Sequence, residues 1–150
     1  MLFGEVTQGQ PNYKIEALNL GKAKGEFSCL KLSGEKVGLV NPMVFADMDA
    51  LWFLGGRPKK IKDKTQSTIY KILITWDKGS PVSAEIKQVK KPNGDPVNIR
   101  GHPTFSPNIP NKKYVPELRT WLFLDDQGGQ HSFNPVTFET TFRDIQTLNF

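Results

Sequence analysis

The chain has 150 residues, of which 37% are hydrophobic and 11% aromatic, and its formal net charge is +5. Such a chain is expected to form a single domain (1–150) with a buried core, and its composition excludes intrinsic disorder. One cysteine, Cys29, excludes both an internal disulfide framework and a cysteine-rich zinc site. Because no leader-like or bilayer-length apolar run is found, we expect a cytoplasmic protein without a membrane partner; a viral or plasmid origin fits equally well.

Four β-strands are predicted in the first part of the chain, at 2–6, 13–20, 25–32 and 37–40. A helix is then predicted from Asn41 to Leu54, because Asn41 suits an N-cap and Pro42 suits the first helical turn. Its apolar positions have helical spacing and comprise Phe45, Met48, Leu51 and Trp52. The pair Gly55-Gly56 is typical of a helix C-cap.

The middle of the chain is strongly basic. Residues 57–91 hold ten basic and three acidic side chains, a sum of +7, whereas 1–56 and 92–150 each sum to −1. Within this region, 57–65 is predicted to be a basic linker. Two interpretations of the charge stay open: an ordinary solvated surface, or a face that binds a polyanion.

The second part of the chain repeats the order of the first. Strands are predicted at 67–76 and 82–89, as a long hairpin, and at 118–124 and 130–133. Between them, 92–116 contains six of the eleven prolines and is predicted to be a loop without regular structure. Asn134-Pro135 then predicts a second helix, running to Leu148. Its apolar stripe comprises Phe138, Phe142, Ile145 and Leu148.

These elements predict an α+β fold that is rich in strands. It consists of two pseudo-repeated ββββα units, 1–56 and 66–150, whose antiparallel sheets pack with two helices. The alternative is that two unrelated helices merely begin with the same Asn-Pro pair.

Two consecutive strand-rich units that each end in a helix resemble the Whirly proteins and, more distantly, the PUR-repeat proteins and the positive-cofactor-type coactivators. The segment 36–54 is similar to the Whirly strand that leads into its first helix, and 20–24 (Leu-Gly-Lys-Ala-Lys) echoes the lysine-glycine-lysine-alanine motif of that family. The resemblance is architectural and carries no binding residue over. It implies single-stranded DNA or RNA as the partner, with DNA favoured, and a homo-oligomer.

The residues themselves supply the two ingredients of single-strand binding, which are flat rings for bases and cations for phosphates. Strand alternation places Arg119, Trp121 and Phe123 on one face, opposite an aliphatic face that is the better candidate for the core. The ring of Trp121 is therefore a candidate platform, although a tryptophan in a strand is also a common core residue. The candidate phosphate-binding residues are Lys59, Lys60, Lys62, Lys64, Lys71, Lys87, Lys90 and Lys91.

Catalysis is not expected, and neither is a metal or a cofactor. His102 and His131 are isolated in sequence. The set Asp77, Glu85 and Lys87 imitates the acidic pair and lysine of Mg²⁺-dependent nucleases, but its spacing is short. A protein-interaction module that docks a basic surface on an acidic partner is the remaining alternative.

Overall fold

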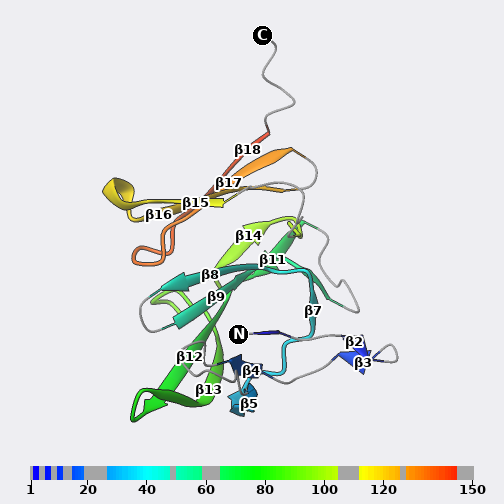
Figure 1. Cartoon of the computed structure of the whole chain (residues 1–150). Helices are drawn as coiled ribbons and strands as arrows, with labels where there is room; N and C mark the ends of the chain where they lie inside the picture. Colours follow the sequence, from blue (N-terminus) through cyan, green and yellow to red (C-terminus); the bar gives the residue numbers. More distant parts are fainter. Residues whose placement is uncertain are drawn as a thin grey trace.

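A computed structural model shows an all-β protein (Figure 1). The structure describes residues 2–3, 6–7, 10–11, 15–18, 27–47, 50–58, 65–104, 112–125 and 128–144. The strands of the first part are β1 Leu2–Phe3, β2 Val6–Thr7, β3 Gln10–Pro11, β4 Ile15–Leu18, β5 Phe27–Cys29, β6 Lys31–Gly34, β7 Leu39–Val40, β8 Met43–Asp47, β9 Ala50–Leu54 and β10 Arg57–Pro58. Those of the second part are β11 Gln66–Thr68, β12 Tyr70–Asp77, β13 Ser80–Gln88, β14 Asn98–Arg100, β15 Lys112–Val115, β16 Thr120–Leu124, β17 Gly129–Phe133 and β18 Thr140–Asp144.

A five-stranded sheet, in the order β6-β13-β12-β9-β8, forms the centre of the molecule. In this sheet β13 pairs antiparallel with β12, β12 with β9, and β9 with β8. β6 pairs with the other edge of β13 in parallel. The longest pairing joins β12 and β13, which are connected by a tight turn at Lys78-Gly79. This hairpin is the one predicted from the alternation of 67–76 and 82–89.

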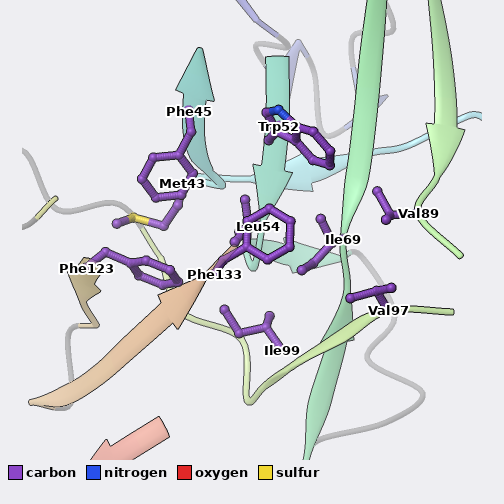
Figure 2. Close-up of a cluster of buried hydrophobic side chains, with 10 residues drawn as sticks. All are labelled: Met43, Phe45, Trp52, Leu54, Ile69, Val89, Val97, Ile99, Phe123 and Phe133. Atoms are coloured by element: carbon purple, nitrogen blue, oxygen red, sulfur yellow. The ribbon is translucent and has the colours of Figure 1, made fainter. Parts of the chain in front are cut away.

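A second sheet, β15-β16-β17-β18, is an antiparallel meander that packs on one face of the central sheet (Figure 1). Figure 2 shows the contact, in which Phe123 and Phe133 meet side chains from β8 and β9. The buried members of this core are Met43, Phe45, Trp52, Leu54, Ile69, Val89, Val97, Ile99, Phe123 and Phe133. Ring contacts hold the layers together, with Trp52 and Phe133 at 5.4 Å in an edge-on arrangement.

The other face of the central sheet is covered by N-terminal residues. Ile15 and Ala17 of β4, together with Leu30, pack against Ile72 and other apolar side chains of β9, β12 and β13. Because both of its faces are buried, β9 is an unbroken apolar run, as is typical of a central strand. A three-stranded sheet, β1-β4-β5, and three two-stranded pairings, β2 with β3, β7 with β10, and β11 with β14, complete the described sheets.

The predicted helix at 41–54 is wrong, because these residues form the β8–β9 hairpin. Asn41 adopts a left-handed conformation with φ of 50° and takes part in a turn instead of an N-cap. Phe45 faces one core while Val44 faces the other, so the apolar residues that suit a helical stripe also suit a strand with two buried faces.

The second predicted helix, from Asn134, is also wrong. The Asn134 side chain does accept the backbone N–H groups of Val136 and Thr137, at 2.8 and 3.1 Å, as an N-cap would. The turn ends at once, because Phe138 is left-handed with φ of 62° and its N–H bonds to the carbonyl of Asn134. The chain then reverses into β18, so 134–139 is a hairpin loop; residues 145–148 of the predicted helix lie outside the described residues.

The α+β class is therefore corrected to all-β: the described residues contain a single turn of 3-10 helix, Pro116–Leu118, and no α-helix. With both helices replaced by hairpins, the two ββββα units are not found. The proline-rich segment 92–116 also differs from its prediction as an irregular loop, since it contains β14 and β15. The predicted strands at 67–76, 82–89, 118–124 and 130–133 are confirmed within a few residues. Within the described ranges, no helix has the length and apolar character to cross a membrane.

Candidate nucleic-acid interface

The clearest basic feature of the described surface is a pair of lysines on the central sheet. Lys71 of β12 and Lys87 of β13 are directly opposite in the register, and Trp52 of β9 is opposite Lys71 on its other side. Cross-strand partners share a face, so the three side chains form one row. We call Lys71 and Lys87 the lysine row.

Each lysine of the row has one compensating contact. The Nζ of Lys71 lies 4.6 Å from the ring centroid of Trp52, a cation–π arrangement. The Nζ of Lys87 lies 3.0 Å from Oε2 of Glu85, two residues away on the same strand. Both side chains of that ion pair are about half exposed, so it contributes little to stability.

The face around the lysine row is polar and positively charged. Ser83 and Glu85 continue the same side of β13, and their parallel pairing with β6 adds Lys31 and Ser33 to it. Three lysines, Lys31, Lys71 and Lys87, and two carboxylates, Glu85 and Asp77, thus lie on this side of the adjoining strands. Two like charges directly opposite each other destabilise a sheet, and a bound anion would relieve this repulsion.

The opposite face of the same strands is closed to a ligand. Ile72, Ala84 and Ile86 are buried there against N-terminal residues. Tyr70 shares this face, and burial raises the pKa of its hydroxyl, with a smaller contribution from the negative charge of Glu35. Among the described residues of β6, β12 and β13, the charged side chains lie on the side with the lysine row.

The other predicted lysines are only partly placed beside this row. Lys90 and Lys91 follow the end of β13 and are exposed, with Lys91 opening a turn in which its carbonyl accepts the N–H of Gly94 at 2.9 Å. Lys59, Lys60, Lys62 and Lys64 lie outside the described residues.

The predicted platform of Arg119, Trp121 and Phe123 is not brought together. Phe123 is 1% exposed, and its ring stacks on His131 in the core. Trp121 is half-buried and contacts the rings of Phe45 and Tyr114, at centroid distances of 4.6 and 5.0 Å, so its ring is not an open stacking surface. Arg119 precedes the strand, in a left-handed conformation, and is exposed.

The expectation that the aliphatic face of this strand forms the core is also reversed. Leu118 is 63% exposed, and Leu122 and Leu124 are only partly buried, while Phe123 is sealed inside. The reason is the partner sheet, which presents the aromatic rings of Phe45 and Trp52 to β16 and β17. Sequence alternation separated the two faces of β16, but it could not show which face packs against the rings of Phe45 and Trp52.

The residues of the nuclease-like arrangement are separated in space. Asp77 ends β12 and pairs with Ser80, whereas Glu85 pairs with Leu73, four residues earlier on β12. Four residues along a strand span about 13 Å, which is too far for two carboxylates to share one ion. Across the described part of the chain, no group of three His, Cys, Asp or Glu side chains is placed to hold a metal.

His131 is not isolated, as it seemed in the sequence, because the β16–β17 turn brings Asp125 to it. The Nε2 of His131 lies 2.7 Å from Oδ2 of Asp125, and Oδ1 of Asp125 accepts the N–H of Gly129 at 2.7 Å. The imidazole is buried between the rings of Phe123 and Phe142, each at 5.0 Å. The available signal in the sequence was the spacing of six residues between Asp125 and His131 across a predicted turn. This pair lies in the core and serves stability.

Replacing Asp125 by Ala is expected to destabilise the fold by about 2–4 kcal/mol, because it removes the acceptor of a buried imidazole and of a turn N–H. Chemical denaturation measures the loss. The control is Asp95→Ala, which removes a carboxylate whose contact with Asn93 is exposed at the surface. Equal effects of the two substitutions would contradict a structural role for the buried pair.

One member of the basic face, Lys31, was missed by the sequence analysis. It joins the lysine row only through the parallel pairing of β6 with β13, two segments about fifty residues apart. No local sequence pattern indicates such a pairing.

In comparisons with known proteins, no family model, no curated protein and no solved structure matches this chain.

Proposed function

We propose that this chain is a non-catalytic protein that binds single-stranded nucleic acid, DNA in preference to RNA, on the face that carries the lysine row. The observation that supports it is the direct opposition of Lys71 and Lys87 in the register, with Glu85 in contact with Lys87 alone. Phosphates bridge such paired cations and release counterions as they do so. The architectural resemblance is not part of this argument, since the helices on which it rested are absent from the described residues.

The most exposed aromatic ring described on β12 does not face the lysine row. Trp76, near the end of β12, is 55% exposed and lies beside the β12–β13 turn. Strand alternation directs Trp76 to the side of Ile72, opposite Lys71, so its ring does not provide a stacking surface beside the lysine row. The proposal for this face therefore depends on its cations.

Fluorescence anisotropy with a labelled single strand tests the proposal. The double variant Lys71→Gln/Lys87→Gln is expected to bind about tenfold or more weakly at low salt, and its log–log salt slope should be shallower by about 1.4, the value for two lost phosphate contacts on a single strand. The wild type should bind a single strand more tightly than a duplex of the same length.

The matched control is Lys113→Gln/Arg119→Gln, which removes the same charge from exposed positions on or next to the other sheet. It should lose far less affinity. An equal loss of affinity in both variants would show that the phosphates do not bind specifically at the lysine row. No binding of any nucleic acid by the wild type at low salt would overturn the function and leave the alternative, a module that docks on an acidic protein.

A further inference from the structure

A cleft of about 760 Å³ opens between β14 and the segment that leads into β18. Its volume lies within the range of small-molecule sites. The wall residues that matter here are Gln66, Lys91, Asn98, Phe138, Glu139 and Thr140. They combine an aromatic ring, two amides, a hydroxyl, one cation and one carboxylate.

The cleft adjoins the lysine row through a single side chain. Trp52 carries the Lys71 ammonium on its ring and contacts the ring of Phe138, whose centroid is 6.4 Å away. Trp52 itself is 2% exposed and cannot receive a ligand. Phe138 is only half-buried, so it is the aromatic ring of this series that both lines the cleft and remains partly accessible.

We propose that this cleft receives one nucleobase of the bound strand, with an adjoining phosphate at Lys91. The inference rests on the proposed function and gives it a base-binding position. Phe138 offers the ring for stacking, which contributes about 1–3 kcal/mol per base. Its left-handed φ of 62° is costly for an aromatic residue, and such strain is concentrated at ligand sites.

Asn98 provides a hydrogen-bond donor for the edge of the base. Its Oδ1 accepts the Thr68 hydroxyl at 3.0 Å, and its backbone carbonyl accepts Thr140 Oγ1 at 3.3 Å, so the residue is held in place. Within the described residues, Nδ2 of Asn98 has no partner. A pyrimidine carbonyl would accept from it.

Charge orients the ligand in this cleft. Lys91 is exposed, and no residue in the described ranges forms an ion pair with it. Glu139 provides the carboxylate of the wall, so a phosphate is favoured at the Lys91 end and repelled from the other. The ligand class is thus a nucleotide within a strand whose base offers a carbonyl acceptor, for which thymidine is the probe.

The test compares two labelled strands of about twelve nucleotides, one of thymidine and one with abasic positions throughout. The wild type is expected to bind the thymidine strand about tenfold more tightly. Asn98→Asp keeps the acceptor for Thr68 but replaces the donor with a carboxylate oxygen, and Phe138→Asn keeps the left-handed backbone but removes the ring. Both should bring the thymidine-to-abasic affinity ratio close to one.

Lys91→Gln should weaken binding of both strands more than Lys90→Gln, which removes the same charge next to the cleft but outside its wall. A wild type that binds both strands equally, or an unchanged ratio in both Asn98→Asp and Phe138→Asn, overturns the base site while the proposed function stands. If no strand binds, a chemical-shift titration with thymidine monophosphate decides. Shifts confined to residues of the cleft support the base site, and the absence of any shift excludes it.

Discussion

Gly55→Ala is expected to destabilise the protein by about 3 kcal/mol or more, and so to lower the midpoint of thermal unfolding by about 10 °C. Gly55 has a φ of +68°, and a Cβ added there would overlap the carbonyl oxygen of Pro103 and approach its Cγ to 2.8 Å. The strand cannot retreat, because the N–H of Gly56 donates to that same carbonyl at 2.8 Å. Urea denaturation followed by tryptophan fluorescence measures the loss.

Gly79→Ala separates the two causes. Gly79 has a similar φ of +79°, but nothing lies within 4 Å of an added Cβ. Only the conformational cost applies there, about 1 kcal/mol. If both variants lost the same stability, close contact with Pro103 would not be the reason that Gly55 is required.

Phe133→Ala is expected to cost about 3–5 kcal/mol, because it opens a cavity between the two sheets. Phe133 is 0% exposed and meets the edge of Trp52 at 5.4 Å (Figure 2). The contact links the C-terminal meander to the central sheet, so its loss removes burial from both layers.

The control for this substitution is Phe27→Ala. Phe27 is 54% exposed on β5, so the same truncation there should change stability by about 0.5 kcal/mol or less. Denaturant midpoints at unchanged m-value provide the comparison. A small loss in Phe133→Ala would mean that the two sheets do not share one core.

The strands at 67–76, 82–89, 118–124 and 130–133 could be predicted from the sequence because they alternate or are rich in β-branched residues. The run 67–76 is the clearest case, and its pairing with 82–89 follows from a tight turn between them. The same reasoning allowed Lys71 and Lys87 to line one surface, and the register places them opposite each other.

The helices could not be judged correctly because a capping pattern specifies a first turn and nothing beyond it. Asn134 forms that first turn with Val136 and Thr137, and Phe138 then ends it. Whether a helix continues depends on which surface buries the next apolar residues. Here Phe142 pairs with His131 across β17 and β18 and contacts its ring, so the segment forms a strand.

The candidate platform failed for a related reason. Alternation separates Trp121 and Phe123 from Leu122, but a partner sheet of rings selects the aromatic side for the interior. The lysine row was accessible to local reasoning, whereas Lys31, Asn98 and Phe138 come together only through pairings between distant segments.

The parallel addition of β6 to β13 has a consequence for how the protein is made. β6 leaves the ribosome early, yet the backbone groups to which it binds belong to a strand synthesised about fifty residues later. Its edge of the central sheet must therefore be completed late, after a costly loop closure, which predicts slow folding for a domain of this size. Until β13 arrives, the nascent chain exposes the unpaired amides of β6 to the cell.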